Sequence, residues 1–117
     1  MPDTPTKRDD YQHAENFRSD YANNVQFESA SLDLTLVFGK TQPQGPVRQH
    51  TAITIAWPYA KLLLYYLQAN IALWESINGK AEIPKVLLPK NPAIDPQIGD
   101  QFKEVIQKVY EEFLTRV

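Results

Sequence analysis

The stretch that most constrains the fold runs from Thr51 to Gly79, where a strand pattern passes directly into a long apolar helix pattern. The six residues from Thr51 alternate between two faces, which indicates a strand with one apolar face. Pro58 suits the first turn of a helix, where a missing backbone N–H costs nothing. Gly79 suits the left-handed position that closes a helix. The sequence therefore predicts a strand over 47–56 followed at once by a helix over 58–78.

The predicted helix is apolar over most of its circumference. Its polar residues Lys61, Gln68 and Glu75 recur every seven positions and mark one narrow polar stripe, and Asn70 and Ser76 are the other polar exceptions. A surface helix on a small sheet needs an apolar arc of little more than about 100°. Part of this helix must therefore face a second partner, which is either the C-terminal helix or another subunit.

Two shorter patterns upstream complete a small sheet. The segment 25–28 is typical of a first strand, and 32–38 has a period of two that Gly39 ends. In the second strand Leu32, Leu34, Leu36 and Phe38 share one face, opposite Asp33, Thr35 and Val37. In the third, Val47, Gln49, Thr51, Ile53 and Ile55 share one face, opposite Arg48, His50, Ala52, Thr54 and Ala56.

Residues 1–24 are polar and are expected to form a mobile arm or a loosely docked short helix, because such a segment buries little apolar surface. Residues 81–96 contain four prolines and are expected to be an extended connector. The last helix is expected over about 96–115, with Asp95 as its cap or Asp100 as a second start. We therefore predict one α+β domain over 25–117. In it, a small antiparallel sheet of about three strands is packed on one face by the long central helix and the C-terminal helix.

Charge and composition narrow the range of partners. The chain has 117 residues, with 12 Lys and Arg against 14 Asp and Glu, and no charge run points to a nucleic-acid partner. Cysteine is absent, which removes disulfides and thiolate chemistry. The longest apolar run, 62–67, is far shorter than the roughly 20 residues that span a bilayer. We expect a soluble, cytoplasmic protein with no membrane insertion.

No residue pattern indicates catalysis. His13 and His50 have no second ligand at metal-binding spacing, so a solvated or hydrogen-bonded histidine is the favoured interpretation. The neighbouring carboxylates at 9–10 and 111–112 are interpreted as solvated charge. No serine lies in a nucleophile elbow, and no glycine-rich loop can be written. We expect no enzymatic activity, no metal and no cofactor.

The features that remain are exposed apolar and aromatic side chains. Tyr and Trp are favoured at interfaces where one end of the ring stays wet. The candidate surface for a client or partner consists of Phe27, Val37, Leu64, Tyr65 and Trp74.

The chain resembles a family of short bacterial and archaeal proteins known as domain-of-unknown-function family 3467. The resemblance covers residues 21–79 and rests on an Asn-Val-x-Phe strand from Asn24, a Leu-x-Leu-x-Phe-Gly strand from Leu34, and a helix opening Tyr-Ala-Lys-Leu-Leu from Tyr59. The resemblance carries no assigned activity.

A second resemblance is to the SecB-type export chaperones. Their helix start is similar to Trp57-Pro58-Tyr59-Ala60-Lys61, and the segment after their helix is similar to Gly79, Ile83-Pro84 and Leu87-Leu88-Pro89. The resemblance implies a dimer or a dimer of dimers that binds unfolded polypeptide along apolar grooves. That family has four strands where three fit here, and it is more acidic.

Two functions remain as hypotheses. The first is a non-enzymatic oligomeric protein-binding module, SecB-like in architecture, that holds unfolded or apolar polypeptide segments. The alternative is a structural or adaptor subunit whose apolar surface is consumed in self-assembly or by one dedicated partner, with no client binding.

Overall fold

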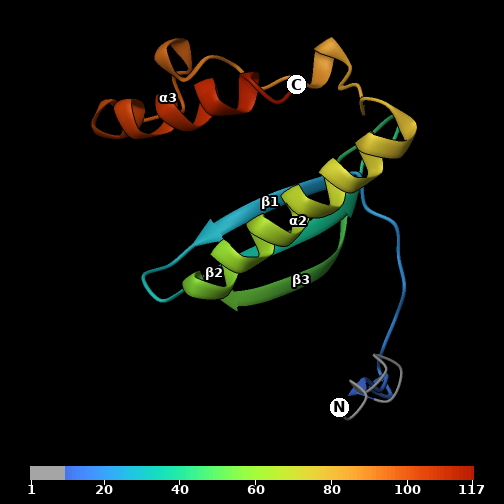
Figure 1. Ribbon diagram of the computed structural model, residues 1–117. Helices are drawn as coiled ribbons and strands as arrows, with labels where there is room; N and C mark the ends of the chain where they lie inside the picture. Colours follow the sequence, from blue (N-terminus) through green and yellow to red (C-terminus); the bar gives the residue numbers. More distant parts are fainter. Residues whose placement is uncertain (1–9) are drawn as a thin grey trace. The chain divides into compact units, whose positions relative to one another are not determined.

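The computed structural model describes residues 10–117, which divide into two compact parts, one ending at Tyr66 and the other running from Leu67 to Val117. Each part is described by itself. A three-stranded antiparallel sheet and two long helices confirm the predicted α+β class (Figure 1). The first nine residues of the predicted arm lie outside the described residues. Residues 11–23 of the arm contain no helix or strand.

The sheet is the main element of the first part. It has the order β1-β2-β3, with β1 at Asn24–Ser29, β2 at Asp33–Lys40 and β3 at Arg48–Ala56. Both pairs are antiparallel, with Phe27 opposite Leu36 and Leu36 opposite Ile53. The strands therefore follow the chain as two hairpins, and β1 and β3 are the edges of the sheet.

The pairing register divides the sheet into two chemically different faces, because residues directly opposite each other in an antiparallel pair lie on the same side. The apolar sheet face presents Val25, Phe27, Leu34, Leu36, Phe38, Ile53 and Ile55, together with the hydroxyl residues Ser29 and Thr51. The polar sheet face includes Gln26, Glu28, Thr35, Val37, Gln49 and Thr54. On the polar face Thr35 and Thr54 share a hydroxyl hydrogen bond of 2.8 Å, and the Gln49 amide donates to the Gln26 carbonyl at 2.9 Å.

A bulge in β3 corrects one predicted face. Phe38 is opposite Thr51, whereas the next residue, Gly39, is opposite Gln49, so His50 is an extra residue in β3. A bulge of this kind reverses the alternation of side chains beyond it. The prediction that Gln49 and Thr51 share a face is therefore wrong, because an alternation pattern carries no signal for one inserted residue.

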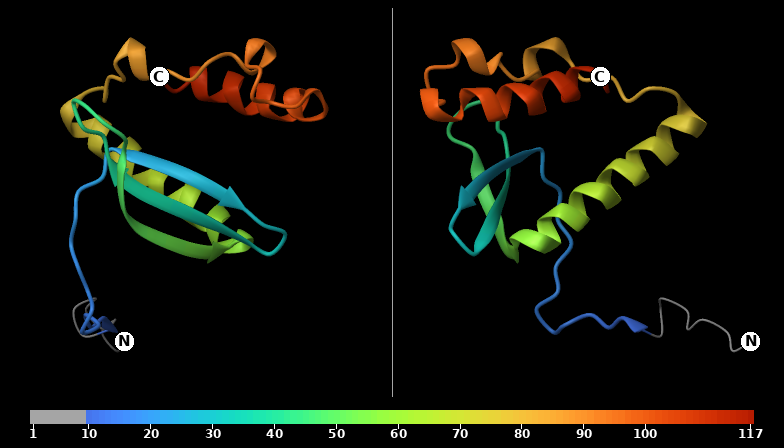
Figure 2. Two further views of the ribbon diagram at one scale, coloured as in Figure 1. Left: turned by 180° about the vertical axis from the view of Figure 1, so that it is seen from behind. Right: turned by 60° about the vertical axis from the view of Figure 1, so that its left-hand side comes forward.

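Helix α2, Trp57–Asn78, begins at the residue directly after β3. The Trp57 indole N–H donates to the Ala30 carbonyl at 2.9 Å, which ties the helix start to the turn between β1 and β2. From there the first turns of α2 diverge from the sheet (Figure 2). At the other end Gly79 has a φ of 86°, and its N–H donates to the Glu75 carbonyl at 2.9 Å. This is the left-handed closure that the sequence predicts.

The rest of the second part is two short 3₁₀ turns and one amphipathic helix. The turns are η1 at Lys85–Leu87 and η2 at Pro92–Ile94, and helix α3 is Asp100–Leu114. The predicted start at 96 is therefore too early, and the alternative start at Asp100 matches. Asp95 accepts instead from the Gln97 N–H at 2.9 Å.

The Lys103 side chain of α3 contacts η2. Its ammonium group lies 3.3 Å from each of the carbonyl oxygens of Pro92, Ala93 and Asp95. These carbonyls belong to η2 and the residue that follows it, and a cation is a favourable partner for such a group of oxygens. The contact holds η2 against the first turns of α3.

Side-chain burial is the most unusual property of the chain. Of the described residues only Gly39 and Pro92 are buried, and no large apolar side chain is. Small folded domains normally enclose a set of Leu, Ile, Val and Phe side chains. The prediction that the two helices pack on one face of the sheet stays a prediction.

Candidate partner-binding surface

The apolar sheet face presents large side chains in rows across the three strands. Phe27, Leu36 and Ile53 form one such row, in which Phe27 is 60% exposed and Ile53 is 49% exposed. Val25 continues this face on β1. A partner that lies on this face meets three neighbouring strands of apolar side chains.

Val37, another predicted site residue, is not on this face. It is opposite Gln26 on β1 and Ala52 on β3, so it belongs to the polar sheet face. The register therefore separates Phe27 from Val37 by the thickness of the sheet. Phe27 and Val37 are 10 positions apart on two strands, and only the register, which the sequence does not show directly, decides their faces.

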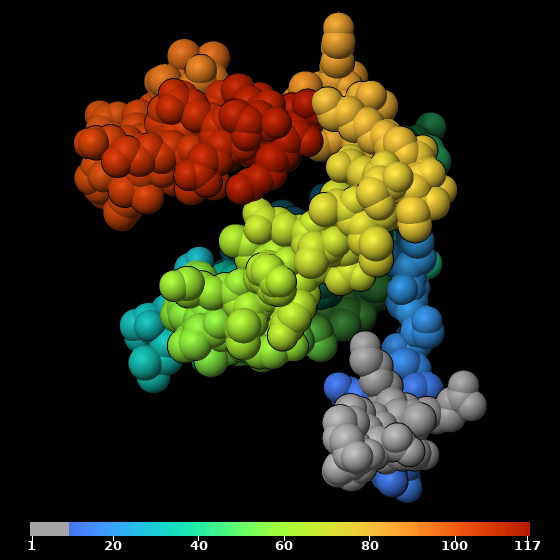
Figure 3. All heavy atoms as spheres, viewed as in Figure 1, coloured from blue at the N-terminus to red at the C-terminus, as the bar shows by residue number. Residues whose placement is uncertain are grey.

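Helix α2 displays apolar side chains on nearly every side. Leu64 is 56% exposed and Tyr65 62% exposed, and both neighbour the polar stripe through Lys61 and Gln68 at helical spacing. Figure 3 shows the side chains of α2, coloured from green to yellow, standing at the surface. Trp74 lies nine positions after Tyr65, which is about two and a half helical turns. Tyr65 and Trp74 therefore lie on opposite sides of α2.

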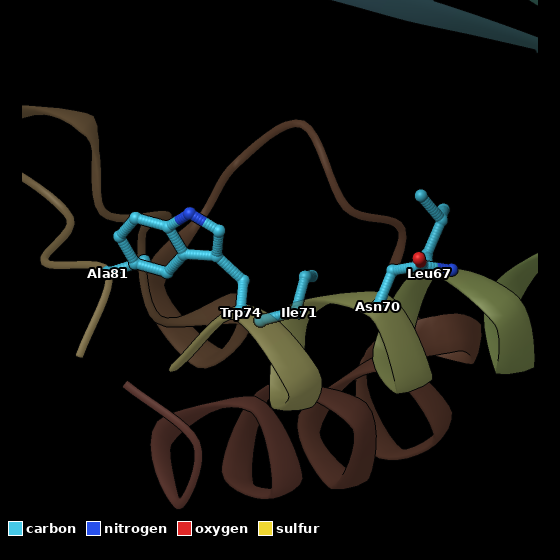
Figure 4. Close-up of a pocket in the computed structure, with 5 residues that line it drawn as sticks. All are labelled: Leu67, Asn70, Ile71, Trp74 and Ala81. Carbon is cyan, nitrogen blue, oxygen red and sulfur yellow. The ribbon is translucent and has the colours of Figure 1, made fainter. Parts of the chain in front are cut away.

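Trp74 is the centre of a shallow apolar hollow in the second part. The Trp74 hollow has a volume of about 310 Å³ and is lined by Leu67, Asn70, Ile71, Trp74 and Ala81. Figure 4 shows these side chains projecting from the same side of α2, with Ala81 on the chain beyond the helix. The Ala81 N–H donates to the Glu75 carboxylate at 2.8 Å, which holds this chain beside the helix end.

The five predicted site residues thus fall into separate places. Phe27 belongs to the apolar sheet face, Val37 to the polar face, and Trp74 to the hollow. Leu64 and Tyr65 flank the polar stripe of α2. Two signals in the sequence point toward this division. Tyr65 and Trp74 are nine residues apart, which places them on opposite sides of a helix, and Val37 directly follows Leu36, which places the two on opposite faces of a strand.

A polar cluster that the sequence analysis missed connects the arm to the sheet. We name it the arm junction: Asp20, Tyr21, Lys40, His50 and Thr51. The Asp20 carboxylate accepts from the Tyr21 N–H at 2.8 Å and lies 3.2 Å from the Lys40 ammonium and 3.5 Å from the His50 ring. The hydrogen bond from the Tyr21 N–H, followed by that from Lys40, lowers the pKa of Asp20 below its ordinary value of 3.8.

The bulge in β3 positions the imidazole of His50 for this junction. The ring Nε2 lies 3.0 Å from the Tyr21 carbonyl, which can only accept, so Nε2 carries the proton. Nδ1 lies 2.7 Å from the Thr51 hydroxyl and 3.5 Å from the Asp20 carboxylate. The interpretation of His50 as a hydrogen-bonded histidine agrees with this geometry. Within residues 10–117, no group of three or more His, Asp or Glu residues could hold a metal ion.

The fold and its surfaces define a small α+β protein that displays its large apolar side chains instead of enclosing them. A comparison with protein-family models identifies its family. Residues 5–83 match the family described as "Protein of unknown function (DUF3467)", and the chain belongs to that family. No curated protein and no solved structure matches the chain. In the described part of the chain, no helix is both long and apolar enough to cross a membrane.

Proposed function

We propose that the protein is a non-enzymatic, self-associating module that binds apolar segments of other polypeptides. The observation that carries the proposal is the exposure of the large apolar side chains along α2 and on the apolar sheet face. Fully burying one such side chain stabilises by about 1.5–3 kcal/mol relative to leaving it exposed. A chain that leaves many of them in water gains that free energy only when another surface covers them.

The distribution of these side chains favours two kinds of binding partner. Tyr65 and Trp74 lie on opposite sides of α2, so one partner helix leaves at least one of these sides open. Contiguous exposed apolar surfaces larger than a few hundred Å² mark interaction sites in soluble proteins. Self-association accounts for part of this surface, and an extended apolar polypeptide on the apolar sheet face accounts for the rest.

The chemistry of the apolar sheet face is that of a sequence-tolerant binding site. It offers aliphatic and aromatic side chains from three strands and no charged group. Binding there depends on apolar area instead of matched hydrogen bonds, so it discriminates little between unfolded segments. This is the behaviour expected of a protein that holds unfolded chains.

The first test is the absolute mass of the protein in solution, measured by light scattering at micromolar concentration. We expect a dimer or a tetramer of the 13.4 kDa chain. A single-chain mass would mean that the chain covers its own apolar side chains, and the proposal would lose its support.

The second test separates client binding from assembly. Phe27→Asp places a charge on the apolar sheet face, whereas Val37→Asp places the same charge on the polar face. We expect Phe27→Asp to weaken protection of an aggregating unfolded protein about tenfold, since a charge on an apolar contact costs at least about 1.4 kcal/mol. Val37→Asp, checked for folding by circular dichroism, should protect as the unmodified chain does. No protection by the unmodified chain would favour the adaptor alternative, in which no client binds. Equal protection by all three proteins would mean that the client does not bind on the apolar sheet face.

A further inference from the structure

The outer edge of β3 is an unprotected pairing surface. Strand β3 is 9 residues long, lies at the edge of the sheet, and has no partner strand on its outer side within residues 10–117. Its first residue, Arg48, is charged, but from Gln49 to Ala56 the strand contains no Asp, Glu, Lys, Arg or Pro. Natural sheet edges are usually blocked by charges, prolines or bulges, because their free N–H and C=O groups pair readily with another strand. The bulge at His50 leaves the segment 51–56 regular.

The other edge differs. Strand β1 has 6 residues and carries the charge of Glu28 near its end. It is therefore shorter than β3 and has one of the features that discourage edge pairing. Strand β3 also has a charge, Arg48, and a bulge at His50, but both lie near its start. Its uncharged, regular segment 51–56 is longer than the uncharged part of β1, so β3 is the better edge for pairing with another strand.

We propose that two copies of this chain associate by antiparallel pairing of their β3 edges, centred on Thr54. The inference rests on the self-association in the proposed function and names the surface that carries it. In a two-fold symmetric contact, one strand meets its own copy running the other way. A pair centred on Thr54 places Thr54 opposite Thr54, Ile53 opposite Ile55, and Ala52 opposite Ala56.

The sequence of β3 is suited to this register. Opposite residues share a face, so only registers centred on a residue keep the two apolar sheet faces on the same side. Centring on Thr54 pairs Thr with Thr and Ile with Ile, which are favourable cross-strand pairs, and sets no like charges against each other. Centring on Ile53 would instead pair Thr51 with Ile55 and bring the bulged His50 against Ala56.

The resulting assembly has a consequence for binding. Two three-stranded sheets joined at β3 make one continuous six-stranded sheet. The rows that contain Phe27, Leu36 and Ile53 in each copy then lie on one side of it. An apolar segment of polypeptide could cross both copies, and the affinity of the paired sheet for a long segment would exceed that of either half.

The absence of cysteine allows a direct test by disulfide cross-linking. Glu28, Thr35 and Thr54 are opposite one another in one row of the polar sheet face, on β1, β2 and β3 respectively. Single variants Glu28→Cys, Thr35→Cys and Thr54→Cys therefore form a matched set. In the proposed register two Thr54 Cβ atoms lie about 4.5–5.5 Å apart, close to the separation of about 3.5–4.5 Å that a disulfide spans.

Under mild oxidation we expect Thr54→Cys to form a thiol-reversible species of twice 13.4 kDa, at least about tenfold faster than the other two variants. Equal rates for all three variants would mean random collision and would overturn the proposal. Fastest cross-linking of Glu28→Cys would place the contact at β1 and overturn it as well.

A second pair of variants tests the same contact without cysteine. Thr54→Lys sets two like charges opposite each other at the centre of the pairing, and Glu28→Lys makes the same kind of change at β1. We expect light scattering to show at least a twofold loss of mass for Thr54→Lys and no change for Glu28→Lys. An unmodified chain of single-chain mass would count against the proposed function itself. An oligomer that Thr54→Lys leaves intact would overturn only the β3 pairing.

Discussion

The sheet and helix α2 differ in how far contacts within this chain account for their structure. In the sheet, the register, the bulge at His50 and the arm junction are all fixed by contacts between residues of this chain, such as the bond between Thr35 and Thr54. In α2, the ends are fixed by local contacts at Trp57 and Gly79, but the large apolar side chains between them are exposed. Contacts within the chain fix its backbone in both regions, whereas the large apolar side chains along α2 are exposed.

The two regions should respond differently to protein concentration if copies of the chain associate. Hydrogen-bonded pairing and caps act within one chain, so their contribution does not change with protein concentration. Apolar burial between copies follows mass action and grows with concentration. Variants in α2 and variants in the sheet should therefore respond differently to dilution.

The largest expected effect is at Leu67. This side chain is 53% exposed in the chain and lines the Trp74 hollow. If assembly covers it, Leu67→Ala should lower the unfolding free energy of the assembled protein by about 2–5 kcal/mol, as a core truncation does. Below the dissociation concentration the loss should fall to about 1 kcal/mol or less, because a half-exposed side chain gains little from burial. Denaturant unfolding at two protein concentrations measures both values.

Leu32→Ala is the control for that comparison. Leu32 is 81% exposed in the turn between β1 and β2, so its truncation should change stability by less than about 0.5 kcal/mol at either concentration. A cost for Leu67→Ala that does not depend on concentration would show that this chain covers Leu67 itself.

A smaller effect, independent of concentration, is expected at Gly39. A Cβ at this position would lie 2.8 Å from the Arg48 carbonyl oxygen and 3.1 Å from the Gln49 Cα. Both atoms are backbone of the paired strand at the bulge, so relief requires the strands to move. We expect Gly39→Ala to cost about 1–3 kcal/mol in the free energy of unfolding, measured by denaturant titration.

Gly45→Ala provides the contrast, because a Cβ at Gly45 meets no atom within 4 Å. Its φ of 91° is the only obstacle, and the expected cost is about 1–2 kcal/mol from backbone conformation alone. A second substitution separates the two variants. The Val47 Cγ1 lies 3.0 Å from a Cβ at Gly39, so Val47→Ala should reduce the cost of Gly39→Ala and leave the cost of Gly45→Ala unchanged.

Much of the fold could be predicted because its signals are local. The period of two in β2, Pro58 in the first turn of α2 and Gly79 after it each act through neighbouring residues. The bulge at His50 could not be predicted, since it is a property of two paired strands. The alternation of apolar and polar residues in β2 and in β3 does not reveal it. The start of α3 was ambiguous because Asp95 can cap a turn as well as a helix, and here its side chain accepts from the Gln97 N–H of a turn.

The candidate surface was harder to predict than the fold. Exposed apolar residue types could be identified, but grouping Phe27 with Val37 needs the register, and grouping Tyr65 with Trp74 needs the helical angle between them. The arm junction was missed for a similar reason: Asp20 and His50 are 30 positions apart and meet only when the strands pair. Contacts of this kind are set by topology instead of spacing.

The smallest expected effect belongs to the arm junction and sharpens the comparison, because it should not depend on assembly. Hydrogen bonds to the Asp20 carboxylate lower its pKa, so the ionised form is favoured in the folded chain. The stabilisation is therefore present above the ordinary pKa of 3.8 and is lost as pH falls through the lower, folded value. The amide resonance of Tyr21, whose N–H donates to Asp20, should titrate with a midpoint below 3.8. The amide of Thr41 donates to the uncharged Asn23 side chain at 2.8 Å and should not follow that titration. A Tyr21 midpoint at or above 3.8, or one that shifts on dilution, would mean that the arm is not held to the sheet by this carboxylate within a single chain.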